Sequence, residues 1–408
     1  MKIFLISVNT VTDPFYSYPI GMGVVTNIMQ SNGHSVKQFD FFAEGLDYGV
    51  FCSQLDLFKP DIVGISIRNN DFTSIKISSK ITAFAKEKHY PVFIGGPGFT
   101  SIPDEFMRQT NADFGLLGPA ESNLVEFINN FQKGVLPEKN IIPFKKFDAI
   151  YAPVYDKKIL NFYSKHDYAL GVYTKKGCIH NCCYCNYKYI DGLVCLYRDI
   201  DEVIKELKLL QNKYKIKSFF FADSVVNDNT DFFANLLKAM IKNKIKIRWS
   251  AFLRPEYMND EIIPLMKETG MTTAILNIDA SNDITLKTMR KGFKWSDVER
   301  TDELFLKHNV SFDVNVSSRA SFIFGGPDET KESVFEGIAN IKKLHFTNMT
   351  IFIFDENFAE GMPQISKTGA SYKTDLNWIR EELVKAFKNY KNILLDFGQN
   401  LDFYKKNR

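Results

Sequence analysis

The strongest constraint on this chain is a group of cysteines near its middle. The sequence has six cysteines, and four of them fall within the eight residues from Cys178 to Cys185. A disulfide framework spreads its bridges across a fold, whereas a tight group of thiols is more typical of a metal site. Thiolates hold iron–sulfur clusters, normally four at a time. The spacing of Cys178, Cys182 and Cys185 supplies three, so we expect one iron to stay open for chemistry.

A zinc knuckle is the alternative interpretation of these cysteines. Its fourth ligand would be Cys183, Cys195 or His180. A knuckle does not need the long series of strands and helices that follows the cysteines, so this interpretation is the weaker one. We therefore expect Cys183 and Cys195 to take no part in binding the cluster.

Short apolar strands alternate with helical segments before the cysteines. This pattern is typical of a parallel sheet covered by helices on both faces, in an α/β fold. The segment from residue 134 to residue 165 has three prolines and little periodicity, so we expect a linker there. The expected strands are Ile3 to Val8, Ser35 to Phe39, Ile62 to Ile67, Val92 to Gly95 and Phe114 to Leu117.

The alternation resumes at residue 169 with six strand–helix units. Six units in about 190 residues fit a partial (β/α)6 barrel better than an eightfold barrel, which needs about 250 residues. The active site should lie at the C-terminal ends of its strands. We predict a doubly wound, Rossmann-like domain over 1–135, a linker over 136–168, the partial barrel over 169–363 and a short helical extension over 364–408.

Composition and charge narrow the class of protein. Hydrophobic residues make up 45% of the 408 residues and charged residues 24%, as in ordinary globular proteins. The net charge of +3 is spread along the chain and gives no basic face, so no nucleic-acid partner is predicted. The first strand is too short for a signal sequence, and no run of eighteen apolar residues occurs. We expect a cytoplasmic protein without a membrane span.

The cysteine motif, placed after the strand that opens the barrel pattern, resembles the radical S-adenosylmethionine (SAM) superfamily. The resemblance implies a 4Fe-4S cluster on Cys178, Cys182 and Cys185, with SAM chelating the open iron. One electron from the cluster would cleave SAM to a 5′-deoxyadenosyl radical, so an electron donor such as flavodoxin or ferredoxin is an implied partner. Tyr184 matches the aromatic position that packs near the adenine.

Four further segments of the barrel are similar to motifs of that superfamily. They read FADS from 221, WSAFLRP from 249, NIDA from 277 and FGGPDET from 324. The second segment implies an arginine that pairs the methionyl carboxylate, and the third a ribose contact through aspartate where many relatives have glutamate. The residues implied to bind SAM are Tyr184, Asp223, Ser224, Arg254, Asn277, Asp279 and Gly325.

A doubly wound domain ahead of such a barrel resembles the cobalamin-dependent branch of the superfamily. The matching segments lie where strands end, which is where open α/β sheets bind ligands. These segments begin at Tyr18, Gly64, Ile94 and Leu117. In the fourth, GPAE from 118 departs from the commoner GEGE, which weakens that contact. The residues implied to contact cobalamin are Ser66, Arg68, Asn69, Asp71, Gly95, Gly96, Phe99, Thr100, Gly118 and Glu121.

The loop after the first strand indicates how the cobalt would be held. Residues 9–18 contain no histidine, so no imidazole would ligate the cobalt from below. The loop from Arg68 to Asp71 resembles the tryptophan-methylase-like subgroup, in which an arginine lies beneath the cobalt without ligating it. A guanidinium cannot coordinate a metal. The plainer interpretation is that Arg68 caps a strand end or pairs with Asp71.

Both resemblances together imply methyl transfer from SAM via methylcobalamin to a carbon of a small metabolite or peptide. Three alternatives stay open: a rearrangement, cyclisation or oxidation with both cofactors; radical chemistry with an empty first domain; and a non-catalytic iron–sulfur regulatory protein. No general base stands out. For four polar residues near the C-terminus, solvated surface is favoured over substrate contact. They are Asp355, Glu356, Glu360 and Tyr404.

Overall fold

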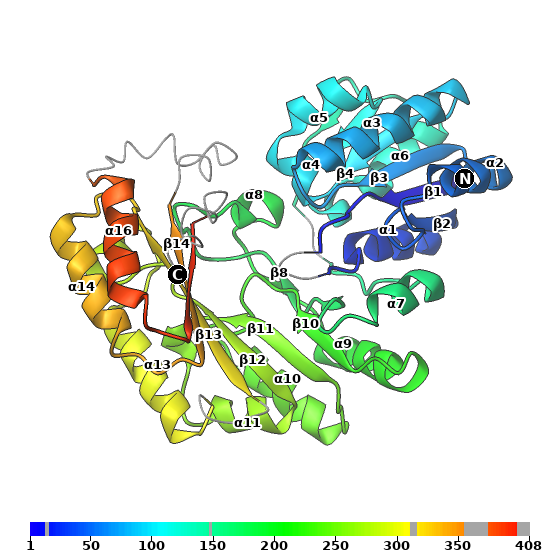
Figure 1. The fold of residues 1–408 in the computed structure, drawn as a ribbon. Coiled ribbons are helices and arrows are strands. Elements are labelled where there is room, and N and C mark those ends of the chain that lie inside the picture. Colours follow the sequence, from blue (N-terminus) through cyan, green and yellow to red (C-terminus); the bar gives the residue numbers. More distant parts are fainter. Residues whose placement is uncertain (13–15, 147–148, 311–315, 355–373, 398–408) are drawn as a thin grey trace. The chain divides into compact units, whose positions relative to one another are not determined.

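The computed structural model describes residues 1–12, 16–146, 149–310, 316–354 and 374–397 (Figure 1). Its two large sheets confirm the predicted α/β class: a six-stranded parallel sheet is followed along the chain by a seven-stranded parallel sheet. The chain divides into two compact units. Unit 1 comprises residues 1–177 with 187–220, and unit 2 comprises residues 178–186 with 221–408.

The sheet of unit 1 has the strand order β2-β1-β3-β4-β5-β6. Its strands are β1 (Lys2–Ser7), β2 (Ser35–Asp40), β3 (Ile62–Ser66), β4 (Val92–Gly95), β5 (Phe114–Leu116) and β6 (Ile141–Ile142). The first five lie where the sequence predicts strands, and β6 lies inside the expected linker. This order is the flavodoxin-like variant of the doubly wound fold, in which ligands bind at the switch point between the neighbouring strands β1 and β3, where the strand order reverses.

Alternating side chains of these strands build the core of unit 1. Phe4 and Ile6 of β1 point to one face and pack there with Phe51 and Leu55 of α2. Aspartates begin two of the helices: Asp47 caps α2, and Asp71 caps α3. The helices are α1 (Ile20–Ser31), α2 (Tyr48–Phe58), α3 (Phe72–Glu87), α4 (Pro97–Ser101), α5 (Pro103–Thr110), η1 (Ala120–Ser122), α6 (Leu124–Gln132), α7 (Lys157–Tyr163), α8 (Tyr187–Ile190), α9 (Ile200–Lys208) and η2 (Leu209–Lys213).

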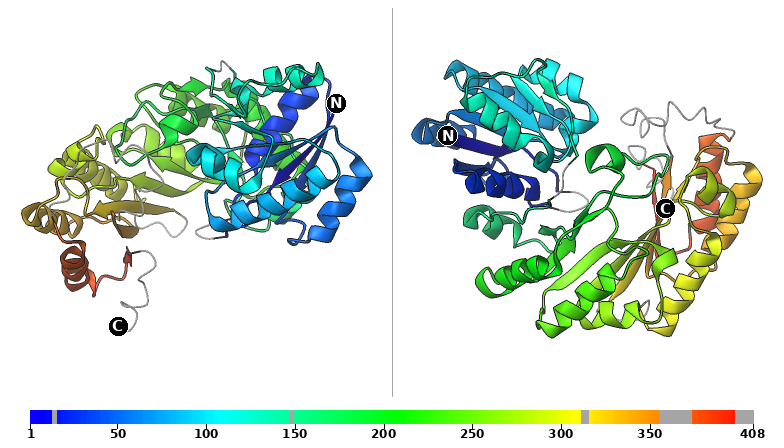
Figure 2. Two further views of the ribbon diagram at one scale, coloured as in Figure 1. Left: turned by 90° about the horizontal axis from the view of Figure 1, so that it is seen from above. Right: turned by 180° about the vertical axis from the view of Figure 1, so that it is seen from behind.

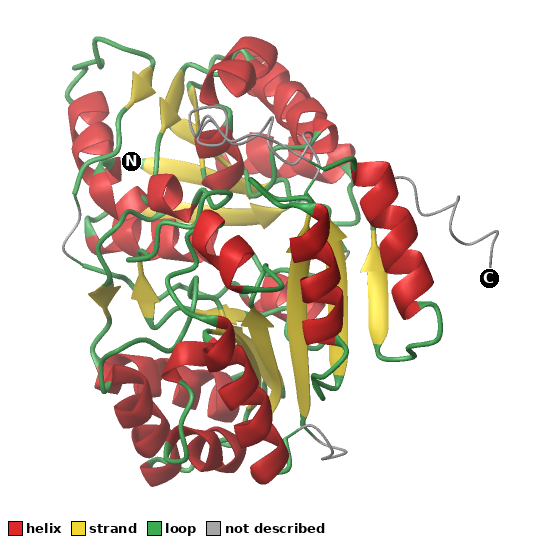
Figure 3. Cartoon of the chain, turned by 90° about the vertical axis from the view of Figure 1, so that its left-hand side faces the viewer, coloured by secondary structure: helices red, strands yellow, loops and turns green. Residues whose placement is uncertain are grey.

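The second large sheet has the order β15-β14-β13-β12-β11-β10-β7. Its strands are β7 (Gly171–Val172), β10 (Ser218–Phe221), β11 (Arg248–Leu253), β12 (Met271–Asn277), β13 (Ser317–Phe324), β14 (Asn348–Ile353) and β15 (Ile393–Asp396). Two short antiparallel strands flank the cysteine segment in the sequence. β8 (Lys175–Lys176) precedes the segment, and β9 (Leu196–Tyr197) follows it. Figures 2 and 3 show the strands and their helices from other directions.

Helices follow most strands of this sheet, as the barrel pattern predicts. In Figure 1, α10, α11, α13 and α14 run along the outer side of strands β11 to β14. The helical elements are α10 (Phe232–Lys242), η3 (Pro255–Tyr257), α11 (Ile262–Glu268), α12 (Asp283–Thr288), α13 (Trp295–Lys307), α14 (Lys331–Ile341) and α16 (Leu376–Phe387).

The C-terminal part differs from the purely helical extension that we expected. Strand β15 follows α16 and pairs in parallel with β14, so the sheet gains a seventh strand. The predicted strand from residue 312 to residue 316 lies mostly outside the described residues, as do Asp355, Glu356, Glu360 and Tyr404. Among the described residues, no helix combines the length and the apolar composition that crossing a membrane requires.

Candidate functional site

The segment from Cys178 to Asn186 forms a loop without helix or strand. Cys178 and Cys182 are buried, and Cys185 is partly buried. The Cys185 N–H donates to the Cys182 carbonyl over 3.2 Å, which makes a tight turn between these two residues. No disulfide joins any of the six cysteines, all of which lie in the described part of the chain. The cysteines of the loop are therefore free thiols in this structure.

The structure holds Cys183 differently from its neighbours. The backbone N–H of Cys183 donates to the Met289 carbonyl over 3.1 Å, and the Cys183 Sγ lies 3.6 Å from the Met289 Sδ. Burial raises the pKa of the Cys183 thiol to about 11. The side chain of Cys183 therefore packs as a neutral thiol against the end of α12.

The described residues contain no group of three or more His, Cys, Asp and Glu side chains that could hold one metal ion. A 4Fe-4S cluster makes a different demand, because each cysteine thiolate binds its own iron and the ligands surround a cluster rather than a single ion. The chemistry of the donor set fits this demand, since Cys178, Cys182 and Cys185 all lie on one irregular loop.

The predicted SAM residues lie at the C-terminal ends of neighbouring strands. Asp223 and Ser224 follow β10, Arg254 follows β11, Asn277 ends β12 with Asp279 two residues on, and Gly325 follows β13. These four strands are consecutive in the sheet. The fold thus brings the predicted residues to one edge, as expected for a barrel active site.

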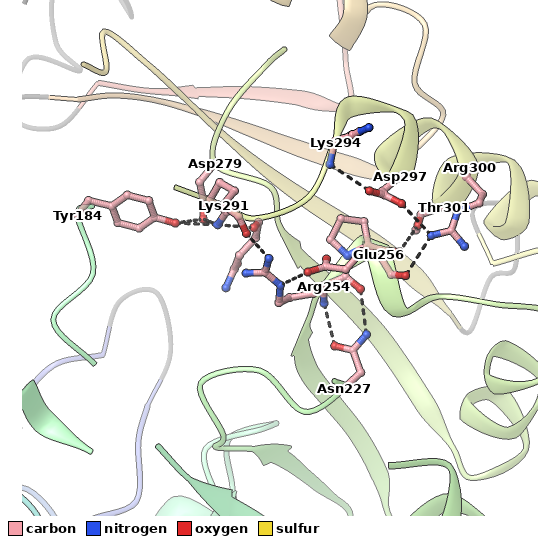
Figure 4. A network of polar contacts seen from close by, with 12 residues as sticks. Tyr184, Asn227, Arg254, Glu256, Asp279, Lys291, Lys294, Asp297, Arg300 and Thr301 are labelled. Carbon is pink, nitrogen blue, oxygen red and sulfur yellow. Dashed lines mark hydrogen bonds and ion pairs between the residues drawn. The ribbon is translucent and has the colours of Figure 1, made fainter. Parts of the chain in front are cut away.

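Asp279 is the centre of a polar cluster in unit 2 (Figure 4). Its Oδ2 accepts hydrogen bonds from the Tyr184 hydroxyl over 2.5 Å and from the Lys291 ammonium over 2.9 Å. Its Oδ1 accepts from the Ser321 hydroxyl over 2.6 Å. The backbone of Asp279 is left-handed, with φ of 54°, a conformation that aspartate tolerates better than most residues. Burial and the Asp279 carboxylate raise the pKa of Tyr184, so the phenol stays protonated.

Arg254 is held firmly in the same unit. Its Nε donates to Glu256 over 2.6 Å, and its Nη2 donates to the Lys291 carbonyl. The Asn227 side chain bonds both backbone groups of Arg254, each over 2.9 Å. The guanidinium also lies over the Phe293 ring, 5.0 Å from its centroid. These contacts orient the Arg254 side chain before any ligand binds.

Gly325 belongs to a tight turn after β13. Its φ of 81° is left-handed, and its N–H donates to Oε2 of Glu329. Glu329 is 1% exposed, and burial raises the pKa of its carboxyl to about 7. Among the described residues, nothing bonds to the other oxygen, Oε1.

In unit 1 the loops after β3 and β4 lie in backbone contact. The Gly98 N–H donates to the Ile67 carbonyl over 3.0 Å. A Cβ on Gly96, whose φ is 105°, would lie 2.4 Å from that same carbonyl oxygen, and a Cβ on Gly98 would lie 2.6 Å from the Asn69 backbone. The sequence suggested that Gly95 and Gly96 admit a ligand; the structure shows that Gly96 is needed for this packing of loop on loop.

Several other predicted cobalamin residues have partners inside unit 1. The Thr100 hydroxyl accepts from the Gly118 N–H over 3.1 Å and donates to the Gly96 carbonyl over 3.0 Å. Phe99 is fully buried in the core, where its ring fills the space beside Gly115. Glu121 forms a buried ion pair with Lys176 at 2.5 Å. The described contacts of Thr100, Phe99 and Glu121 therefore stabilise unit 1 itself.

Arg68 and Asn69 follow β3, and Ser66 is its last residue, so all three lie at the switch point between β1 and β3. Burial lowers the pKa of Arg68, and the nearby phenols of Tyr173, Tyr187 and Tyr163 oppose that shift. Asp71 accepts hydrogen bonds from the backbone N–H and the hydroxyl of Ser74. Asp71 therefore acts as a helix cap for α3.

Sequence reasoning missed three residues of the unit 2 cluster: Lys291, Ser321 and Glu256. Lys291 lies eleven residues beyond the NIDA segment, and nothing in the sequence indicates that it is buried. Ser321 lies in the middle of β13, 42 residues from Asp279. Only the fold brings these residues together.

Comparison with known proteins assigns both parts of the chain. Residues 172–340 match the Radical SAM superfamily, and residues 6–128 match the B12 binding domain. An uncharacterized methyltransferase of Pyrococcus horikoshii is 27% identical over 349 residues, which cover 80% of this chain and 73% of that protein. The cytidylyl-2-hydroxyethylphosphonate methyltransferase of Streptomyces wedmorensis is 23% identical, with coverage of 77% and 70%.

A solved structure shares the arrangement of the elements. The radical SAM methyltransferase TsrM of Kitasatospora setae, with cobalamin and a [4Fe-4S] cluster bound, aligns with a TM-score of 0.72. The alignment covers 86% of this chain and 74% of TsrM at 19% identity, a level that establishes the fold alone. The function rests instead on the two family matches, which identify this protein as a cobalamin-dependent enzyme of the radical SAM superfamily, with a 4Fe-4S cluster, SAM and cobalamin as its cofactors.

Proposed function

We propose that this enzyme is a methyltransferase that moves a methyl group from SAM to a carbon of a small metabolite or peptide. One observation carries the proposal: a B12 binding domain and a radical SAM domain share a chain whose relatives include proteins named methyltransferases. When bound, the cluster supplies an electron to SAM, and cobalamin carries the methyl group. An external donor such as flavodoxin or ferredoxin would supply that electron.

The cluster ligands in this proposal are Cys178, Cys182 and Cys185. Two observations support the assignment. The three residues lie on one loop without regular structure, and the side chain of Cys183, the other cysteine of that loop, is occupied by packing against Met289.

The SAM site in this proposal is the strand edge of unit 2. Tyr184 would lie against the adenine, and Arg254 would pair the methionyl carboxylate. A guanidinium has five N–H donors, and Glu256 and the Lys291 carbonyl use only part of them. Asp223 and Ser224 would approach the methionyl amine, and Asn277 and Gly325 the remaining parts of the cofactor.

The cobalamin site in this proposal is the switch point between β1 and β3 in unit 1. Ser66, Arg68 and Asn69 lie nearest to it, and Gly95, Thr100 and Gly118 lie on the adjoining loops. Because residues 9–18 contain no histidine and a guanidinium cannot ligate a metal, Arg68 would leave the lower cobalt face without a protein ligand. Cobalamin held in this way would supply its methyl group as a cation.

The missing lower ligand has a spectroscopic consequence. The paramagnetic resonance spectrum of bound cobalamin in its Co(II) state should show no nitrogen hyperfine splitting, because the proposed site places neither a protein imidazole nor the cofactor's own benzimidazole beneath the cobalt. An Arg68→His variant serves as the comparison, since it places an imidazole at the same position of the chain. Nitrogen splitting in the wild-type spectrum would contradict the assignment of Arg68.

Methyl transfer itself is tested with isotopically labelled SAM. The chain is reconstituted anaerobically with iron, sulfide and hydroxocobalamin, and we expect about four irons and one cobalamin per chain. Incubation with a reductant and SAM labelled in its methyl group should place the label on the corrinoid, as measured by mass spectrometry.

Each alternative predicts a different result in the same experiment. Bound cobalamin that stays unlabelled while 5′-deoxyadenosine forms would indicate a rearrangement, cyclisation or oxidation. Iron without cobalamin would leave radical chemistry alone to explain the function. A full cluster that consumes no SAM under strong reduction would indicate a regulatory protein.

A further inference from the structure

We propose that Lys291 is a positioning residue of the SAM site, which holds Tyr184 with its side chain and Arg254 with its backbone. The inference rests on the proposed function, because it takes Tyr184 as the adenine contact and Arg254 as the partner of the methionyl carboxylate. The two residues come from distant parts of the chain, the cysteine loop and the end of β11. Lys291 contacts both of them.

The ammonium of Lys291 is fully engaged. It donates to the Tyr184 hydroxyl over 2.8 Å, to the Asp279 carboxylate over 2.9 Å and to the Asn277 carbonyl over 2.9 Å. An ammonium has three N–H donors, so these three acceptors define one position for it. Figure 4 shows Tyr184, Asp279 and Lys291 converging on this point. The orientation of the Tyr184 phenol is set by the same contacts.

Burial makes this arrangement sensitive to change. The side chain of Lys291 is 3% exposed and that of Asp279 is 11% exposed. The ammonium also lies 5.4 Å from the centroid of the Tyr184 ring and 5.9 Å from that of Phe293. Removal of the ammonium would leave the Asp279 carboxylate buried without its cation, and the cluster would have to rearrange.

The backbone of Lys291 holds the Arg254 side chain in position. Its N–H donates to the Leu286 carbonyl over 2.9 Å, which fixes the residue at the end of α12. Its carbonyl accepts from Nη2 of Arg254, while Glu256 holds Nε of the same guanidinium. The position of Lys291 therefore sets the direction of the Arg254 side chain.

The side chain and the backbone of Lys291 would act together on SAM. SAM has an adenine at one end and a methionyl group at the other, and both ends must be held for its sulfonium to be placed correctly. Because Lys291 contacts both Tyr184 and Arg254, it would set the distance between the groups that hold the two ends of SAM. Asp279 mainly holds Tyr184 and Lys291 in position, because its two oxygens already accept three hydrogen bonds from neighbouring side chains.

The test is a Lys291→Met variant of the full chain with its reconstituted cluster. We expect about four irons per chain, as in the wild type, and a dissociation constant for SAM raised about tenfold, measured by anaerobic equilibrium dialysis. The change that SAM causes in the paramagnetic resonance spectrum of the reduced cluster should also diminish. Lys291→Arg, which keeps the charge, should recover part of the affinity.

The matched control is Lys294→Met. Lys294 lies three residues further along and is exposed, and its side chain points away from Asp279 in Figure 4. This variant should bind SAM like the wild type. A Lys291→Met chain that also binds SAM like the wild type would overturn the inference.

A second variant keeps the test decisive if Lys291→Met does not fold. Tyr184→Phe removes only the hydroxyl that Lys291 contacts, and it should weaken SAM binding several-fold. Where Lys291→Met does fold, its effect and that of Tyr184→Phe should not add fully in the double variant, because both changes break the same contact between Lys291 and Tyr184. Additive effects, or an unchanged affinity in Tyr184→Phe, would overturn the inference. A wild-type chain that carries its cluster and binds no SAM would instead contradict the proposed function.

Discussion

Replacement of Cys182 by alanine is expected to abolish the iron–sulfur cluster. The wild-type chain should take up about four irons after anaerobic reconstitution and turn brown, whereas Cys182→Ala should retain almost none. The physical reason is that the loop offers only three thiolates at the required spacing, and loss of one leaves two irons without a protein ligand. Iron content and visible absorption measure the effect.

Cys183→Ala is the matched control for this prediction. The two cysteines are adjacent, but the Cys183 thiol packs against Met289 at 3.6 Å and is neutral because burial raises its pKa to about 11. Its removal should cost only about 1 kcal/mol of stability through a small cavity and leave the iron content unchanged. Equal loss of iron in the two variants would refute the ligand assignment.

Most of the fold could be predicted from local sequence. The first five strands of unit 1 lie where the sequence predicts them, and β4 has the predicted limits, Val92–Gly95. Four strands were missed, namely β6, β8, β9 and β15. β6 has two residues within a proline-containing segment, and β15 has four after an amphipathic helix. Their pairing with distant strands stabilises them, and that pairing is not visible in a local pattern.

Some residues of the candidate site could likewise be predicted from local sequence, and others could not. The cysteine spacing, Arg254 and Asp279 stand in short motifs, so the sequence alone points to them. The contact between Lys291 and Tyr184 joins residues 107 positions apart and depends on how the loop meets the barrel. Gly96 is a residue that the sequence singles out but whose neighbour it does not identify. Its place in a Gly-Gly pair suggests a close approach, but only the structure shows that the neighbour is the Ile67 carbonyl.

Glu329 should make the stability of unit 2 depend on pH. It is 1% exposed, its Oε2 accepts from the Gly325 N–H, and burial raises its pKa from 4.5 to about 7. At pH 5 the carboxyl is protonated in the folded chain and the burial costs little. Above the folded pKa it is ionised in both states, and the buried charge then destabilises the fold by about 3 kcal/mol, at 1.36 kcal/mol per unit of pKa.

A Glu329→Gln variant removes that charge and keeps an oxygen that accepts from Gly325. The unfolding free energy of the variant should exceed that of the wild type by up to about 3 kcal/mol at pH 8 and match it within about 1 kcal/mol at pH 5. Urea unfolding followed by tryptophan fluorescence measures the difference where it matters, because Trp249, Trp295 and Trp378 all belong to unit 2. Glu336→Gln, on the exposed side of α14, should show no such dependence. If Glu329→Gln were destabilising at pH 8, the carboxylate would have to be ionised and stabilised in the fold, and the turn at Gly325 would depend on its charge.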